Sequence, residues 1–123
     1  MKKVFAIFLI AHGAIELLAA AALITGPAGI FAAGMGEQWS MHYGFAALTI
    51  ASVSLWLWPY RSEIRVVTPL LGLLLTFHVS IFVSLTLAGD QAAGMGMHAV
   101  LAVMAAILFV TRARWCAPQG TNG

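Results

Sequence analysis

Four long apolar runs, separated by short breaks, constrain the fold of this chain more than any other feature. The runs cover about residues 4–24, 39–58, 66–88 and 93–110 of the 123-residue sequence. Each run is close to the length of about 20 residues that an α-helix needs to cross a bilayer. Glycine and proline end the runs, at Gly26 and Pro27, at Pro59 and at Gly89. The pattern predicts an all-α, polytopic membrane protein, with one four-span domain over residues 1–115 and a disordered tail over residues 116–123.

The composition agrees with a membrane protein and excludes several other classes. Only 8% of the residues are charged and 62% are hydrophobic, whereas a soluble domain has about 25% charged residues. The net charge is only +2 and no basic run is present, so nucleic acid is not an expected partner. Cys116 is the single cysteine, which excludes a disulfide within the chain. The expected partner is the lipid bilayer itself.

The basic residues predict the topology of the four spans. If the spans alternate in direction, as in an up-down bundle, all six basic residues fall on one side: Lys2, Lys3, Arg61, Arg65, Arg112 and Arg114. The other side has only Glu37 and Asp90. The positive-inside rule then places both termini in the cytoplasm, with the protein in the plasma (inner) membrane. A cleaved signal peptide is the alternative for the first run, but His12 and Glu16 inside that run argue against it.

A short repeat indicates internal duplication. The sequence Ala-Ala-Gly-Met-Gly occurs at residues 32–36 and again at residues 92–96. Each copy lies shortly before a histidine of the second or fourth run. The repeat predicts two tandem helix hairpins related by an axis along the membrane normal.

The ionisable residues inside the runs are the candidate functional residues. Glu16 is the only one of the ten charged residues inside a run, and each run has one histidine: His12, His42, His78 and His98. Ionisable groups are costly in hydrocarbon and mark functional sites by default. At a rise of about 1.5 Å per residue, His12 and His78 lie near the centres of their spans, and His42 and His98 lie further out. Depth therefore pairs His12 with His78 and His42 with His98.

Metal or haem binding, in a redox or metal-handling role, is the function that these residues favour. Imidazole is the commonest metal ligand, so all four histidines are candidate cofactor ligands. Haem would bind between paired histidines, with Gly13 and Gly44 making room for the porphyrin. Copper would bind to imidazole, thioether and carboxylate groups, and its candidate ligands are His42, His98, Met41, Met97 and Glu16.

Three other functions remain open from the sequence. A chain of Glu and His residues can relay protons, which would suit a proton-coupled transporter or an accessory subunit of a membrane complex. His12 and Glu16 could instead form the acid–base pair of a metal-free enzyme that acts on a lipid-like substrate. The histidines could also only form hydrogen bonds between helices. Four spans are few for a transporter, so a homo-oligomer or a larger complex is expected.

Overall fold

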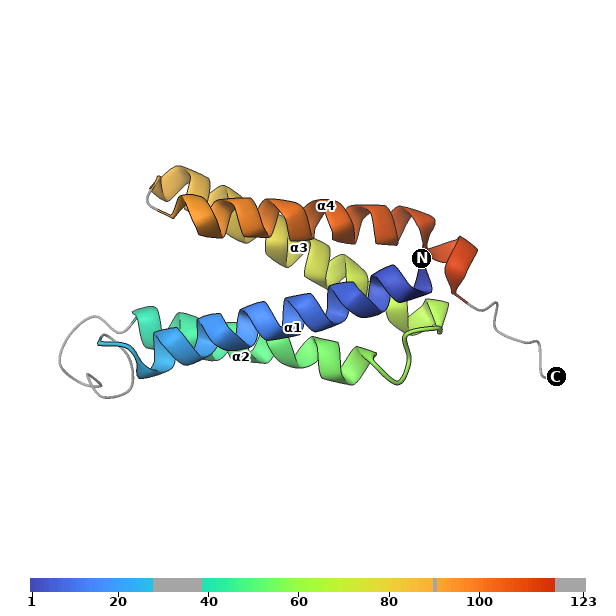
Figure 1. Ribbon diagram of the computed structural model, residues 1–123, viewed down its shortest axis with the longest axis horizontal. Helices are drawn as coiled ribbons and strands as arrows, with labels where there is room; N and C mark the ends of the chain where they lie inside the picture. The colour runs from blue at the N-terminus through green and yellow to red at the C-terminus, as the bar shows by residue number, and fades with distance from the viewer. Residues whose placement is uncertain (28–38, 90, 117–123) are drawn as a thin grey trace. The chain divides into compact units, whose positions relative to one another are not determined.

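Four α-helices make up the regular secondary structure of the protein. The computed structural model describes residues 1–27, 39–89 and 91–116. The helices are α1 (Lys2–Thr25), α2 (Trp39–Leu57), α3 (Ile64–Ala88) and α4 (Ala92–Trp115) (Figure 1). The predicted helices are confirmed, and the main difference is that α4 continues beyond residue 110 to Trp115. The first copy of the repeat, Asp90 and residues 117–123 of the predicted disordered tail lie outside the described residues, whereas Cys116 is described and buried.

Three of the helices, α1, α3 and α4, are long and apolar enough to cross a membrane. The remaining helix, α2, has 19 residues and is less apolar, because serine, threonine and histidine interrupt its apolar side chains. The prediction of four apolar helices therefore holds for three of them by length and composition.

The chain divides into two compact units. Unit 1 comprises Met1–Phe8 and Leu57–Gly123, and unit 2 comprises Leu9–Trp56. Unit 1 therefore contains the first turns of α1 together with α3 and α4, and unit 2 contains the rest of α1 together with most of α2.

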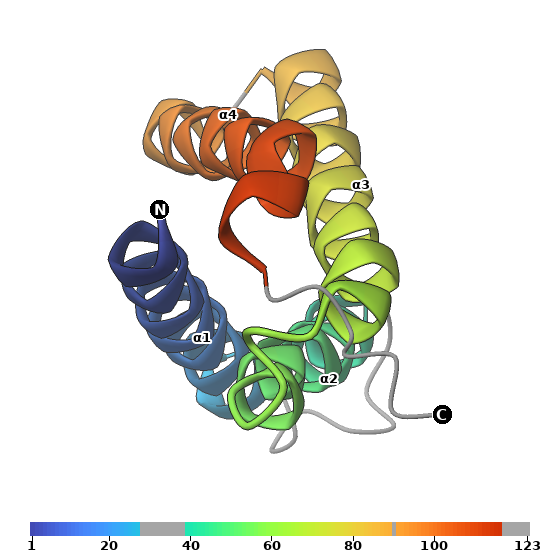
Figure 2. The ribbon, with the colours of Figure 1, turned by 90° about the vertical axis from the view of Figure 1, so that its right-hand side faces the viewer.

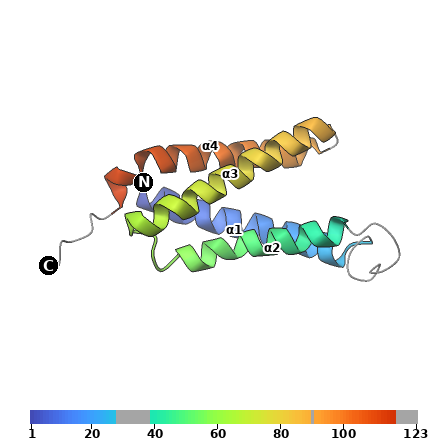
Figure 3. The same cartoon turned by 180° about the vertical axis from the view of Figure 1, so that it is seen from behind.

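In unit 1, α3 and α4 form an antiparallel hairpin, and they lie side by side in Figures 1 and 3. Contacts occur in opposite order along the two helices: Thr68 with Arg112, a Cβ at Gly72 with Phe109, His78 with His98, and a Cβ at Gly94 with Leu85. Gly89 ends α3 with a φ of 73° and donates its N–H to the carbonyl of Leu85. Glycine adopts this left-handed conformation without the steric cost of a Cβ, so the predicted break at Gly89 is confirmed.

One end of unit 1 carries all the basic residues of the chain. The Phe5 ring of α1 packs on the Trp115 ring of α4, with centroids 4.8 Å apart. Arg112 donates from Nε to Thr68 Oγ1 at 3.0 Å, which ties the end of α4 to the start of α3. Figure 2 looks onto this end. Every Lys and Arg lies in the segments that meet here, the start of α1, the start of α3 with its preceding turn, and the end of α4.

In unit 2, glycines let α1 and α2 approach closely, and the two helices run side by side in Figures 1 and 3. A Cβ added at Gly13 would lie 3.2 Å from the Cβ of Ser54. A Cβ added at Gly44 would lie 2.7 Å from Cγ1 of Ile24 and 3.1 Å from the Cβ of Leu23. Small residues at such positions are typical of helix packing in membranes.

The outer surfaces of the helices are strongly apolar. Several large aliphatic side chains are 61–84% exposed, namely Ile7, Ile10, Leu18, Leu55, Leu87 and Val110. Exposed hydroxyls, such as those of Thr49 and Thr86, donate to the carbonyl four residues earlier in their own helix. These polar groups are therefore satisfied without water, as helix surfaces in hydrocarbon require.

Candidate functional site: buried histidines and a carboxyl group

The described part of the chain buries polar side chains while it exposes apolar ones. The buried polar residues are His12, Glu16, Ser54, His78 and His98. A buried polar group costs free energy unless it is hydrogen-bonded or bound to a ligand. These residues therefore form two candidate polar sites: His12, Glu16 and Ser54 in unit 2, and His78 and His98 in unit 1.

His12 is anchored to the neighbouring helix of unit 2. Its Nε2 lies 3.1 Å from the backbone carbonyl oxygen of Ile50 in α2. A carbonyl can only accept a hydrogen bond, so Nε2 is the donor. In the neutral ring the lone pair is then on Nδ1. Donation from one ring nitrogen to a backbone carbonyl is the usual way that proteins orient a histidine whose other nitrogen binds a metal.

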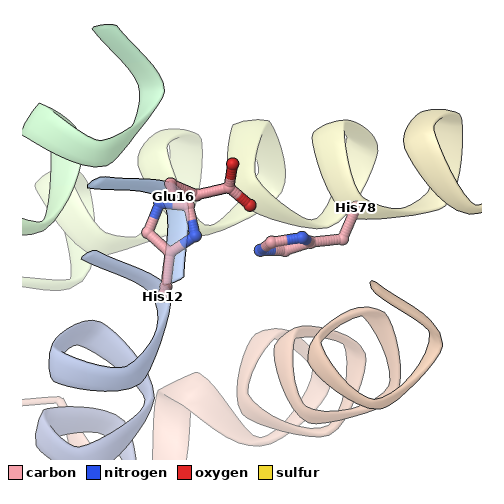
Figure 4. Close-up of side chains that lie close together, drawn as sticks. All are labelled: His12, Glu16 and His78. Carbon is pink, nitrogen blue, oxygen red and sulfur yellow. The ribbon is translucent and has the colours of Figure 1, made fainter. Parts of the chain in front are cut away.

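Glu16 lies one turn after His12 on α1, and its side chain is 1% exposed. A carboxylate oxygen of Glu16 and a ring nitrogen of His12 lie within 4.8 Å of one another, and both side chains appear on α1 in Figure 4. The spacing of four residues predicts this shared face, and the structure confirms it. The pair supplies one oxygen and one nitrogen donor in a buried position.

His78 and His98 form a second buried pair, inside unit 1. Their Nδ1 atoms are 3.0 Å apart, within hydrogen-bonding distance. The ring of Phe77 lies edge-on to both imidazoles, with centroid distances of 5.2 Å to His78 and 6.0 Å to His98. Phe8 of α1 is also edge-on to His78, at 6.4 Å. Phenylalanine rings therefore flank both imidazoles.

The buried face of α3 explains why His78 points inward. From the sequence, either of two faces of this helix could be the buried one: the apolar face around His78 or the face with hydroxyl groups. The apolar face is the buried one, through Val67, Leu71, Leu74 and His78. The hydroxyl-bearing residues Thr76, Ser80 and Ser84 are exposed.

The partner of His98 differs from the one that depth along the sequence suggests. Depth pairs His98 with His42, whereas the structure places it against His78. His42 is exposed and lies edge-on to Trp39, with ring centroids 6.4 Å apart. Met97 is 38% exposed and Met41 is half-buried. The copper ligand set of His42, His98, Met41, Met97 and Glu16 therefore stays a prediction.

The two glycines expected to leave room for a porphyrin serve another purpose. Ser54 lies over Gly13, and Ile24 and Leu23 lie over Gly44, all within unit 2. The space above both glycines is therefore filled by the neighbouring helix. The glycines permit helix packing, and they do not line a slot.

Two participants escape sequence reasoning. The Ile50 carbonyl that anchors His12 is a backbone group, which sequence patterns do not report. Ser54 lies at the contact with Gly13, and its buried hydroxyl has no hydrogen-bond partner among the described residues. The spacing of small residues along α2, with Ala47 and Ala51 before Ser54, is the signal that could have identified this packing face.

No protein-family model, curated protein or solved structure matches this chain. Its class is therefore defined by its own fold and site. It is an all-helical protein with three helices that are apolar enough to cross a membrane. A buried His/Glu pair lies in one unit and a buried His/His pair in the other.

Proposed function

We propose that the protein is a multi-pass protein of the plasma membrane, an up-down bundle of four transmembrane helices with both termini in the cytoplasm. Three observations support this: the exposed aliphatic surface, the hydroxyls bonded to their own helices, and the gathering of basic residues at one end of unit 1. Helices that expose apolar side chains need a lipid environment, and basic residues are retained on the cytoplasmic side.

The proposed function is binding of a transition-metal ion by buried imidazole and carboxyl groups, in a redox or metal-handling role. The observation that carries the proposal is the buried imidazole pair of His78 and His98, whose Nδ1 atoms are 3.0 Å apart beside the Phe77 ring. Metal sites use histidines that a hydrogen bond from the second ring nitrogen orients, and the Nδ1 contact would orient one of these two rings in a similar way. His12 and Glu16 form a separate buried donor pair in unit 2.

A single ion suits this geometry better than haem does. Two axial imidazoles with metal–nitrogen bonds of about 2 Å place their nitrogens about 4 Å apart, with the porphyrin plane between them. The Nδ1 atoms of His78 and His98 are 3.0 Å apart, so no porphyrin fits between these atoms. Imidazole and carboxylate donors suit divalent first-row ions such as Fe²⁺, Zn²⁺ and Cu²⁺, and a thioether would shift the preference toward Cu(I).

Metal analysis and an absorption spectrum of the protein purified in detergent test this proposal. We expect close to one equivalent of a transition metal and no haem absorption. Replacing His78 with Ala should remove the metal, whereas Met97→Leu should reduce only copper. Protein that contains no metal after purification, and takes up none from added Co²⁺, Zn²⁺ or Cu²⁺, would refute the proposal.

Proton relay is the second candidate function, and the same imidazole contact favours it. An N–H···N hydrogen bond between two histidines can pass a proton from one ring to the other. The protein would then be a proton-coupled transporter or an accessory subunit, working as a homo-oligomer or in a larger complex. Proteoliposomes with a trapped pH dye distinguish the two functions, because only the relay predicts a proton flux that His98→Leu abolishes in metal-free protein.

A further inference from the structure

Three helix ends in unit 1 carry an exposed basic residue with an exposed apolar residue one helical turn further from the end. These pairs are Lys3 with Ile7 on α1, Arg65 with Pro69 on α3, and Arg114 with Val110 on α4. Residues four positions apart lie on the same face of a helix. Ile7 is 61% exposed and Val110 is 78% exposed. Each of the three faces therefore presents a cation next to open apolar surface.

The remaining charges of unit 1 leave these three cations available for a partner. Arg112 donates to Thr68 and lies over the ring of Phe109, and Arg61 donates to the carbonyl of Trp58. Both guanidinium groups are thus held by the protein itself. Glu63 is the only acidic side chain among the described residues of unit 1, and no ion pair with it is formed there. The basic charge at this end is therefore largely uncompensated.

We propose that these faces of unit 1 bind anionic phospholipids, with the headgroup phosphate at the cation and an acyl chain along the apolar residues of the same face. The inference rests on the proposed membrane location and is independent of metal binding. Guanidinium and ammonium groups both bind phosphate, and basic residues near a membrane surface attract anionic lipids. The stems of Lys and Arg can lie along apolar surface while the charged group stays at the interface.

The apolar half of each face favours a lipid over a soluble phosphate compound. A soluble anion would occupy only the cation and would leave Ile7, Pro69 and Val110 uncovered. A phospholipid covers both parts of the face. On α3 the apolar surface continues for a further turn to Leu73, which is 46% exposed. This extension along the helix matches a chain that runs away from the headgroup.

Lipid competition in detergent micelles tests the proposal. The protein is mixed with equal amounts of phosphatidylglycerol, which is anionic, and phosphatidylcholine, which has the same phosphodiester but no net charge. Native mass spectrometry then counts the bound lipids of each kind. We expect the wild type to prefer phosphatidylglycerol, and Lys3→Gln, Arg65→Gln and Arg114→Gln each to lower the ratio of bound phosphatidylglycerol to phosphatidylcholine by about fivefold. The triple variant should bind both lipids about equally.

A charge-matched variant separates recognition by a helix face from attraction by net charge. Glu63 is exposed and makes no side-chain cap on α3, so Glu63→Gln should not disturb the helix. The double variant Glu63→Gln with Arg65→Gln has the net charge of the wild type but lacks the cation of the α3 face. We expect it to bind less phosphatidylglycerol than the wild type, whereas Arg65→Lys should bind as the wild type does. Circular dichroism establishes that each variant keeps its helices.

Three results would overturn the inference: equal binding of the two lipids by the wild type, wild-type lipid preference in the charge-matched double variant, or displacement of bound phosphatidylglycerol by excess inorganic phosphate. The last result would identify a site for a soluble anion. Washing cell membranes with alkaline carbonate tests the membrane location separately. Protein that the wash releases would contradict the proposed location, whereas protein that stays in the membrane without a preference for phosphatidylglycerol would contradict only the lipid site.

Discussion

The close contact of α1 and α2 in unit 2 predicts a graded response to Gly→Ala substitutions. A Cβ at Gly44 would lie 2.7 Å from Cγ1 of Ile24 and 3.2 Å from its backbone nitrogen, and a Cβ at Gly13 would lie 3.2 Å from the Cβ of Ser54. A Cβ at Gly96 meets nothing within 4 Å. Optimal carbon–carbon separations are about 3.5–4.0 Å. The helices must therefore separate in the first two variants and need not move in the third.

The expected magnitudes follow from two opposing effects. Overpacking a tight contact costs about 1–3 kcal/mol, and replacing glycine with alanine inside a helix gains about 1 kcal/mol. Gly96→Ala should show only the gain in stability from the higher helix propensity of alanine, because its Cβ meets no other atom within 4 Å. Relative to Gly96→Ala, we expect Gly13→Ala to be less stable by about 1 kcal/mol and Gly44→Ala by about 3 kcal/mol. Gly44→Ala is the more severe change because its nearest neighbour would be only 2.7 Å away and a backbone nitrogen 3.2 Å away, whereas at Gly13 the nearest atom would be 3.2 Å away.

A compensating substitution tests the mechanism directly. Ser54→Gly removes both side-chain atoms that a Cβ at Gly13 would meet, and it removes a buried hydroxyl that has no hydrogen-bond partner among the described residues. The double variant Gly13→Ala with Ser54→Gly should therefore be more stable than the sum of the single effects, with a coupling of about 0.5–3 kcal/mol. Gly44→Ala with Ser54→Gly should show no coupling.

Reversible unfolding in detergent micelles by sodium dodecyl sulfate, followed by circular dichroism, measures these differences. Equal stabilities for Gly44→Ala and Gly96→Ala would refute the packing of α1 on α2. A Gly13→Ala variant that Ser54→Gly fails to rescue would show that these residues do not face each other. The same variants report on the site, because separating the helices at Gly13 would lengthen the 3.1 Å contact between His12 Nε2 and the Ile50 carbonyl.

Three further predictions concern the carboxyl group, the topology and the cysteine. Glu16→Gln should fold normally and bind metal about tenfold or more weakly, and a Glu16→Gln variant with full metal content would make the carboxylate a structural group. Reporter fusions at Gly123 should be active only in the cytoplasm and fusions in the segment 28–38 only outside, because basic residues stay inside; an externally active reporter at Gly123 would contradict the topology. Burial raises the pKa of the Cys116 thiol, with smaller opposing effects of the charges of Lys2 and Arg112. Less thiolate is therefore present near pH 8 than for an ordinary cysteine. Maleimide should label Cys116 of the folded protein slowly near pH 8, and the labelling rate should increase with pH. A rate at Cys116 equal to that of the exposed cysteine introduced by Arg114→Cys would contradict this prediction.

The helices were predictable because their cause is local. Each of the four runs carries its own apolar length and its own breakers, and Gly89 illustrates this, since its left-handed conformation ends α3 where the sequence places a break. The extension of α4 to Trp115 was missed because its last turn contains Arg112 and Arg114, which look like the end of a span. In the structure Arg112 bonds to Thr68 and stacks over the Phe109 ring at 4.1 Å. Basic residues in the last turn of a helix are stabilised by its dipole, so the helix continues through them.

The pairing of the histidines was only partly predictable, because it depends on helix rotation as well as depth. The spacing of His12 and Glu16 lies within one helix, so sequence alone placed them on one face. The contact between His78 and His98 depends on which face α3 turns toward α4, and two faces of α3 compete in the sequence. A rotation of one residue corresponds to about 100° around the helix axis, so small errors in facing exchange one partner for another. The depth of a residue along its helix does not indicate how the helix is rotated about its axis.

The placement of polar groups links the fold to the proposed chemistry. A helix that exposes Ile10 and Leu18 while burying His12 and Glu16 is unfavourable in water and favourable in lipid, where the apolar side chains meet hydrocarbon. Lipid in turn makes the buried polar groups costly, so each needs a partner. His12 has one in the Ile50 carbonyl, and His78 and His98 have one in each other. These bonds engage one nitrogen of each of these rings, and each bond thereby restricts the tautomer and orientation of its ring. The hydrogen bonds that make the histidines tolerable in the bundle are thus the same ones that would orient them toward a metal ion. Removing an acceptor should therefore alter metal affinity even when the helices remain intact.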